Sequence, residues 1–188
     1  MPFVTHETSR VPLLECDQVT GDVAAIYDKL QAERNLIPNM FKAVANIPGL
    51  ALGFSQLLKP LTGDAVLPAV YKELVATHVA ALNQCEYCVS SHSYLSKLRG
   101  ATPEQIAALD TYETGPFTER EKAGLRYADQ LHLGGNAIDD AAWQKVSAHF
   151  TQNELIELTA LIGAFEFFPR FNSALHIPVT PLPEEQAK

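Results

Sequence analysis

The feature that most restricts the fold of this 188-residue chain is a set of helix-start signals between segments of helical periodicity. Each signal is a Thr followed three residues later by Glu or Gln, at Thr102–Gln105, Thr118–Glu121 and Thr151–Glu154. In such a capping box each side chain binds a backbone N–H that the helix itself leaves free. Apolar residues recur every three or four positions, and no run alternates in the manner of a strand. We therefore predict an all-α protein.

The same periodicity places helices along most of the chain, and seven to nine are expected in total. Asn83 is expected to be the N-cap of the helix that carries two closely spaced cysteines, and Pro169 to bend the last helix. The predicted helical segments are 23–34, 40–45, 50–59, 67–82, 84–99, 103–109, 119–133, 140–150 and 155–175.

No linker or internal repeat divides the chain, so residues 1–188 are expected to form a single domain. Residues 1–20 lack a helical pattern and are expected to be irregular. The tail 179–188, which is rich in proline and charge, is expected to fray.

Composition excludes several classes of protein. A net charge of −8 gives no basic face for nucleic acid or an anionic membrane. No apolar run reaches the roughly 20 residues that span a bilayer, and residues 1–11 do not resemble a signal peptide. The hydrophobic fraction of 47% is enough for a real core. We expect a cytoplasmic protein without a nucleic-acid partner, a membrane partner or a cofactor.

The main chemical signal is the pair Cys85 and Cys88, followed by His92. On a helix these three residues share one face, because they lie at positions i, i+3 and i+7. Cys85 is expected in the first turn, where free amides and the helix dipole stabilise a thiolate. The third cysteine, Cys16, stands alone and is interpreted as a spectator thiol.

Two readings of the cysteine pair are open at this point. In the first, one thiolate attacks a peroxide and becomes a sulfenic acid, which the neighbouring thiol converts to a disulfide while His92 moves a proton. In the second, the cysteines bind structural zinc, with His92 and Glu73 as further ligands. The chain has no second Cys/His pair of the kind that usually completes a zinc site, which favours the redox reading.

Glu73 lies in the apolar helix that precedes the cysteine pair. If the two helices form a hairpin around Asn83, the Glu73 carboxylate falls near Cys88 and His92 and accepts the thiol proton through water. The alternative is a half-exposed glutamate that pairs with Lys72 or Lys97.

The spacing Glu73, eleven residues, Cys85, two residues, Cys88, three residues, His92 resembles the signature of the alkylhydroperoxidase (AhpD-like) family. This family lies within the carboxymuconolactone decarboxylase superfamily. Further similarity is found around the signature, and the likeness covers roughly residues 35–178. The segments that carry it are 36–41, 48–50, 80–88, 118–123 and 167–178.

The resemblance implies an AhpD-like helical fold and a role for each signature residue. Cys88 is implied to attack a hydroperoxide, and Cys85 to resolve the product and meet an external dithiol reductant, a lipoyl or thioredoxin-like protein. Glu73 and His92 are implied to form a proton relay. The resemblance also implies a homo-oligomer: a dimer, trimer or hexamer.

Tyr87 departs from the pattern of the better-known hydroperoxide reductases, which carry histidine immediately before the second cysteine. Tyrosine has a pKa near 10 and is a poor base at neutral pH, so we interpret Tyr87 as a core or interface ring. Two other functions stay open. One is the lactone decarboxylase branch of the superfamily, which generally lacks the cysteine pair, and the other is a non-enzymatic helical oligomer with a zinc site.

The remaining histidines are expected to be structural. His78 is interpreted as a core or interface residue, whereas His132, His149 and His176 have no partner spacing and are expected at the surface. Arg170, which lies in an aromatic run, is expected to pair with a buried acid or to face a substrate.

Overall fold

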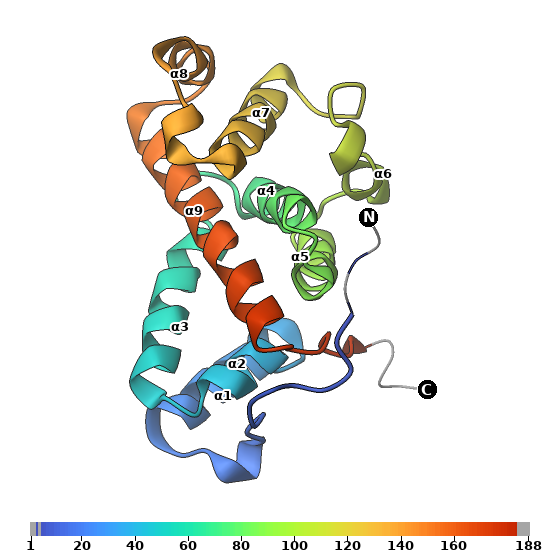
Figure 1. Cartoon of the computed structure of the whole chain (residues 1–188), viewed down its shortest axis with the longest axis vertical. Helices are drawn as coiled ribbons and strands as arrows, with labels where there is room; N and C mark the ends of the chain where they lie inside the picture. The colour runs from blue at the N-terminus through green and yellow to red at the C-terminus, as the bar shows by residue number, and fades with distance from the viewer. Residues whose placement is uncertain (1–2, 4, 184–188) are drawn as a thin grey trace.

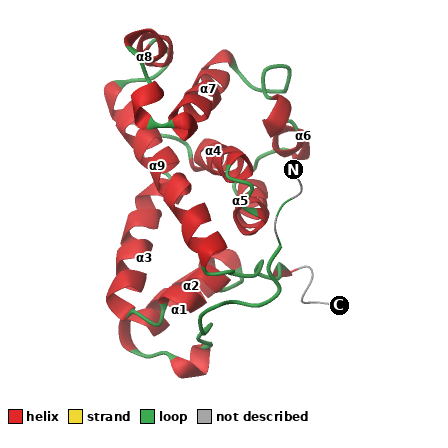
Figure 2. Cartoon of the chain, in the orientation of Figure 1, coloured by secondary structure: helices red, strands yellow, loops and turns green. Residues whose placement is uncertain are grey.

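A computed structural model describes residue 3 and residues 5–183, and in these residues the protein consists of helices and loops without strands (Figures 1 and 2). The all-α prediction is confirmed. The described residues form the α-helices α1 (Gly21–Arg34), α2 (Asn39–Val44), α3 (Pro48–Thr62), α4 (Ala69–Leu82), α5 (Glu86–Leu98), α6 (Pro103–Ala107), α7 (Glu119–Leu133), α8 (Asp140–Ser147) and α9 (Gln152–Ala174). Short 3-10 turns lie at Cys16–Gln18, Leu109–Thr111 and Gly135–Ala137.

Helix α4 is the centre of the molecule, and it packs against α5, α7 and α9 (Figure 1). Its residues are apolar on nearly every side, a composition typical of a helix that is surrounded by others. Eleven of its fourteen residues are buried, including the charged Lys72 and Glu73. The position of α4 therefore determines which elements meet around these two charges.

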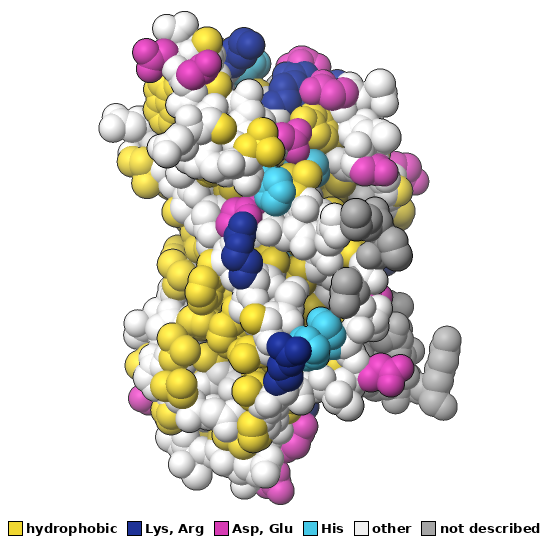
Figure 3. Space-filling model, in the orientation of Figure 1, with side chains coloured by type: hydrophobic (Ala, Val, Ile, Leu, Met, Phe, Trp, Pro, Cys, Tyr) yellow, Lys and Arg dark blue, Asp and Glu magenta, His cyan; other side chains and the backbone are white. Residues whose placement is uncertain are grey.

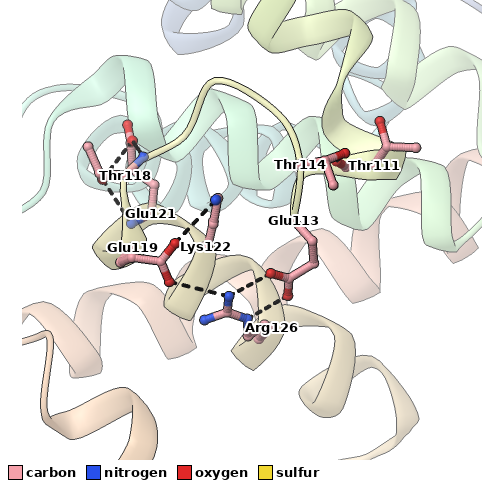
Figure 4. A network of polar contacts seen from close by, with 8 residues as sticks. All are labelled: Thr111, Glu113, Thr114, Thr118, Glu119, Glu121, Lys122 and Arg126. Atoms are coloured by element: carbon pink, nitrogen blue, oxygen red, sulfur yellow. Dashed lines mark hydrogen bonds and ion pairs between the residues drawn. The ribbon is translucent and has the colours of Figure 1, made fainter.

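The three predicted capping boxes all form. In each, the Thr hydroxyl accepts the N–H of the residue three positions later, whose side chain accepts the Thr backbone N–H. Figure 4 shows the box that starts α7, where Glu121 accepts from Thr118 at 2.8 Å. In the same view Arg126 binds Glu113 at 2.5 Å and Glu119 at 3.5 Å. These exposed ion pairs tie the preceding loop to α7 but add little stability.

The longest helix, α9, runs 23 residues and continues through Pro169. Its buried face packs on α4, α5 and α7. Within the described residues, neither α9 nor any other helix combines the length and apolarity that crossing a membrane requires.

Two of the predicted helix ends differ from those in the structure. Helix α3 does not stop at Pro60 but extends to Thr62, because Leu61 is buried and the Thr62 hydroxyl donates to the Leu58 carbonyl at 3.0 Å. Helix α8 ends at Ser147 rather than at residue 150.

The tail is not frayed where it is described. Thr180 is buried, and its hydroxyl accepts the backbone N–H of Asn39 at 2.9 Å. This contact holds the start of the predicted 179–188 tail against α2. Residues 184–188 of that tail, and residues 1, 2 and 4 of the predicted irregular segment 1–20, lie outside the described residues.

Lys72 is completely buried and is neutralised by Glu157 of α9. Its Nζ lies 2.5 Å from Glu157 Oε1 and donates to the Pro60 carbonyl at 2.7 Å. The second oxygen of Glu157 accepts the backbone N–H of Leu67 at 2.7 Å. One buried ion pair thus joins the end of α3, the start of α4 and the middle of α9.

We predict that Glu157→Gln destabilises the protein by about 3–5 kcal/mol, because it leaves the Lys72 charge buried without a counter-ion. Chemical denaturation of the purified variant measures this loss. The matched control is Glu33→Gln, which breaks the exposed Lys29–Glu33 pair and is expected to cost about 1 kcal/mol or less. Equal losses in the two variants would contradict the structural role of the buried pair.

Candidate active site

Helices α4 and α5 form a hairpin, and a three-residue turn sets the register between them. Asn83 ends α4, since its side-chain amide donates to the Val79 carbonyl and to Glu166 Oε1, both at 2.9 Å. Gln84 follows in the left-handed conformation, with φ 54°. The predicted N-cap role of Asn83 is therefore wrong: the left-handed residue turns the chain, and Cys85 becomes the N-cap of α5.

Cys85 and Cys88 form a disulfide at the start of α5, with their Cα atoms 5.3 Å apart. Cys85 lies one residue before the expected first turn, and its Sγ accepts the Cys88 backbone N–H at 3.3 Å. This amide and the positive end of the helix dipole favour a thiolate on Cys85. Both cysteines are buried, with 4% and 2% of their surface exposed.

Glu73 and His92 meet across the hairpin. Glu73 Oε2 lies 2.7 Å from His92 Nδ1, and only 1% of Glu73 is exposed. The His92 ring packs edge-on against Phe165, with ring centroids 4.5 Å apart. The predicted juxtaposition is confirmed, and the alternative of a half-exposed Glu73 paired with Lys72 or Lys97 is wrong. Because Glu73 engages Nδ1, the His92 nitrogen left for other chemistry is Nε2.

Asn172 of α9 is a site residue that sequence analysis did not identify. Its Nδ2 donates to Cys88 Sγ at 3.4 Å, and it is 2% exposed. Its Oδ1 is buried and has no hydrogen-bond partner in the described part of the chain. The available signal was an amide on the buried face of a helix, next to Phe171, where an apolar residue is the usual choice.

Tyr87 holds the turn of the hairpin against the rest of the molecule. Its hydroxyl oxygen accepts the backbone N–H of Met40 at 3.1 Å and lies 3.4 Å from the Thr180 hydroxyl. Burial raises the pKa of Tyr87 above its usual value. The interpretation of Tyr87 as a core ring is confirmed, and its raised pKa is unsuited to a base at neutral pH.

Two neighbouring hollows lie at the disulfide, and each is lined by one of the two cysteines. The larger, of about 40 Å³, is lined by Cys88, His92 and Asn172. The smaller, of about 10 Å³, is lined by Cys85 and by His6 of the N-terminal segment, and Asn172 also borders it. The two cysteines therefore face different sides of the site.

The N-terminal segment covers the Cys85 side. His6 stacks on His176, with ring centroids 3.8 Å apart, and the Thr5 hydroxyl donates to the Glu86 carboxylate. His176 is half-buried, so its expected position at the surface without a partner is wrong. The partner lies 170 residues away in sequence, and no local spacing indicates it.

Other predicted histidines lie outside the site. His78 is buried and lies 2.6 Å from Asp129, which confirms its structural interpretation. His149 is exposed as expected. His132 is half-buried and lies 2.7 Å from Glu166, so the expectation that it has no partner is wrong.

Cys16 is exposed and free, and the structure does not bring it to the other cysteines. Arg170 is exposed and pairs with Glu166 at 2.9 Å, so the expected acid partner is present, but this acid is half-buried rather than buried. Within residue 3 and residues 5–183, no three His, Cys, Asp or Glu side chains gather in a group that could hold a metal ion. The zinc reading therefore has no donor set among these residues.

Comparison with known proteins identifies relatives in sequence. The profile of the carboxymuconolactone decarboxylase family matches residues 48–130, which contain both cysteines and His92. The uncharacterized protein YnjA of Escherichia coli (strain K12) is 34% identical over 113 residues, covering 60% of this chain and 62% of YnjA. The match thus spans less than two thirds of that relative. The uncharacterized protein H16_B0147 of Cupriavidus necator is 32% identical over 89 residues, 45% of this chain and 79% of that protein.

The fold matches solved structures over almost the whole chain. One is a protein of Ralstonia eutropha JMP134, described as an alkylhydroperoxidase AhpD core and an uncharacterized peroxidase-related protein. Its TM-score is 0.85 at 21% identity, covering 93% of this chain and 94% of that one. At this identity the likeness concerns the fold, which is the AhpD-like all-α fold.

We predict that Asn172→Leu lowers the thiolate fraction of Cys88 at neutral pH in the reduced protein by about tenfold or more, because a hydrogen bond to an ionised group contributes about 1.5–3 kcal/mol. The measurement is the ultraviolet absorbance of the thiolate against pH, in a Cys85→Ser background. The matched control is Asn153→Leu on the exposed side of the same helix. An unchanged Cys88 titration in Asn172→Leu would show that the amide does not stabilise the thiolate.

Proposed function

Because this chain belongs to the AhpD-like branch of the carboxymuconolactone decarboxylase superfamily, we propose that it is a thiol-dependent peroxidase that reduces hydroperoxides through a Cys85/Cys88 dithiol–disulfide cycle. The observation that carries the proposal is the arrangement around Cys88. Its sulfur lines a small cavity together with His92, and His92 is paired with the buried Glu73. A nucleophilic thiol, a resolving thiol and a proton carrier therefore lie in one place.

In the first step the Cys88 thiolate attacks the terminal oxygen of ROOH. The O–O bond breaks, Cys88 becomes a sulfenic acid, and the departing alkoxide takes a proton to become ROH. His92 Nε2 accepts the proton of the Cys88 thiol and returns it to the alkoxide, while Glu73 keeps the ring oriented and stabilises its protonated form. Asn172 stabilises the thiolate through its hydrogen bond to Sγ.

In the second step the Cys85 thiolate attacks the sulfenic sulfur of Cys88. The S–O bond breaks as the disulfide forms, and the departing hydroxide takes up the proton that the Cys85 thiol released and leaves as water. The amide hydrogen bond at the N-cap favours the thiolate form of Cys85 that this step needs. An external dithiol, a lipoyl or thioredoxin-like protein, then restores both thiols by exchange at Cys85, which lines the other hollow.

We also propose that the protein is a homo-oligomer that buries an apolar patch on α3 and α9. Figure 3 shows apolar side chains gathered over these two helices. The exposed fractions are 39% for Leu50, 48% for Leu57 and 48% for Phe167. Contiguous exposed apolar surface of this kind usually marks a contact with another protein. A second copy of the chain is the partner that the family resemblance implies.

The redox cycle predicts that the two cysteine variants fail differently. Cys88→Ser is expected to abolish peroxide consumption, because no sulfenic acid can form. Cys85→Ser is expected to consume about one equivalent of peroxide per chain and to leave a sulfenic acid at Cys88. Peroxide consumption and mass spectrometry after trapping with dimedone measure the two outcomes.

Cys16→Ser is the matched control, since Cys16 is an exposed thiol far from the site in sequence and is expected to leave turnover unchanged. The reverse pattern, with oxidation retained only in Cys88→Ser, would exchange the roles of the two cysteines. Peroxide consumption that is unaffected by both variants would overturn the peroxidase proposal. In that case the lactone decarboxylase branch becomes the function to assay.

The patch predicts that Leu57→Glu shifts the protein toward monomer, because a charge within a packed apolar interface loses its hydration. Light scattering coupled to size-exclusion chromatography measures the mass at micromolar concentration. Ile156→Glu, at an apolar position that is 62% exposed and lies nearer the other end of α9, serves as the control. A monomeric wild-type protein would contradict the proposal directly.

A further inference from the structure

Arg34, the last residue of α1, is a cation without an acceptor next to the candidate active site. Its backbone carbonyl accepts the Tyr94 hydroxyl at 3.1 Å, but its guanidinium makes no hydrogen bond or ion pair with any described residue. Burial lowers the pKa of Arg34, and Glu73 is the acid that opposes this effect most strongly from beyond contact distance. Five N–H donors without a protein partner are costly in a half-buried position unless a ligand satisfies them.

The Arg34 side chain lies at the boundary between two cavities. One is the 40 Å³ hollow that contains Cys88 and His92. The other is a vestibule of about 430 Å³, and Arg34, Phe41 and Leu58 line both. Among the residues that line both cavities, Arg34 is the one that carries a charge.

The volumes of the two cavities indicate which part of a substrate each can hold. A space of about 40 Å³ holds a few water-sized groups, which is enough for a peroxide but not for the organic group attached to it. A vestibule of about 430 Å³ lies within the range of cavities that bind small organic molecules. The body of an organic hydroperoxide therefore fits in the vestibule while its peroxide reaches Cys88.

The charges of the vestibule favour an anion, although the whole chain has a net charge of −8. Its two acids are already engaged: Glu33 pairs with Lys29 at 3.8 Å, and Asp64 accepts the Ala69 backbone N–H at 2.9 Å.

Three vestibule cations have no acidic contact among the described residues: Arg34, Lys59 and Arg99. Apolar side chains, among them Ile26 and Leu30, form much of the remaining lining, together with Ser55 and Thr62. The vestibule therefore combines an apolar wall with unpaired cations.

We propose that this vestibule is the substrate-binding site and that it selects amphipathic organic hydroperoxides that carry a carboxylate. Arg34 binds the carboxylate, with Lys59 and Arg99 adding to the positive field, and the apolar wall holds the hydrocarbon. The substrate carboxylate takes no part in the redox step; its binding to Arg34 positions the peroxide group at Cys88. This inference rests on the proposed peroxidase function for the reacting group, whereas the carboxylate site can be tested separately.

The first experiment measures binding without turnover, by calorimetric titration of the wild-type protein with octanoate and with methyl octanoate. Octanoate is expected to bind at least about tenfold more tightly than the ester, and Arg34→Gln is expected to remove most of that difference. The matched control is Lys145→Gln, which removes one lysine from a different cavity on α8 and is expected to keep the difference.

Because Arg34→Gln changes a half-buried residue, the double variant Lys59→Gln/Arg99→Gln provides a second test at two exposed positions. It is expected to weaken octanoate binding severalfold while leaving ester binding unchanged. Circular dichroism checks that each variant is folded. Equal binding of octanoate and its ester to the wild type, or no effect in either vestibule variant, would overturn the carboxylate site.

The second experiment compares kcat/KM for 8-hydroperoxyoctanoate, its methyl ester and hydrogen peroxide. We expect kcat/KM to be about tenfold or more higher for 8-hydroperoxyoctanoate than for the other two substrates. In Arg34→Gln this preference is expected to fall. Peroxide turnover with equal values for acid and ester would overturn the inference and leave the peroxidase function standing. Arg34-dependent octanoate binding without turnover of any peroxide would support the carboxylate site and overturn the proposed function.

Discussion

Lys72 and Glu73 are buried side by side on the central helix α4, and the packing of α5 and α9 depends on giving each of these side chains a partner. Successive residues of a helix point about 100° apart, so no single neighbour can serve both. Glu157 of α9 binds Lys72 on one side, and His92 of α5 binds Glu73 on the other. Since an unpaired buried charge is strongly destabilising, these two contacts restrict how α5 and α9 pack on α4.

The same packing builds the candidate active site. Placing His92 against Glu73 fixes the register of the hairpin, and the left-handed Gln84 then makes Cys85 the N-cap of α5. Helix α9, held against α4 partly through Glu157, brings Asn172 to the sulfur of Cys88. The Lys72–Glu157 ion pair and the Glu73–His92 pair therefore both result from the packing of α5 and α9 on α4. The redox chemistry that we propose depends on both pairs.

The two sides of the disulfide have different surroundings. Cys88 lines a small cavity that borders the cationic vestibule, whereas Cys85 lies beside the N-terminal segment that carries His6. Such a division suits a cycle in which a small oxidant and a larger reductant must reach the same pair of sulfurs. In the cycle that we propose, the peroxide enters from the side with room for its organic group, and the reductant approaches the other cysteine.

Local patterns in the sequence determined the helical fold, the capping boxes at Thr102, Thr118 and Thr151, and the shared helix face of Cys88 and His92. These features depend on residues within one or two turns of each other, so periodicity and spacing reveal them. Tertiary structure alone decided the parts that depend on distant residues: Lys72 with Glu157, Asn172 at Cys88, Tyr87 at Met40, and Arg34 between the two cavities. In each case, a helix far away in the sequence determines whether a polar side chain has a hydrogen-bond or ion-pair partner. Local propensity carries no information about that element, because burial and hydrogen bonding are settled only when the helices pack.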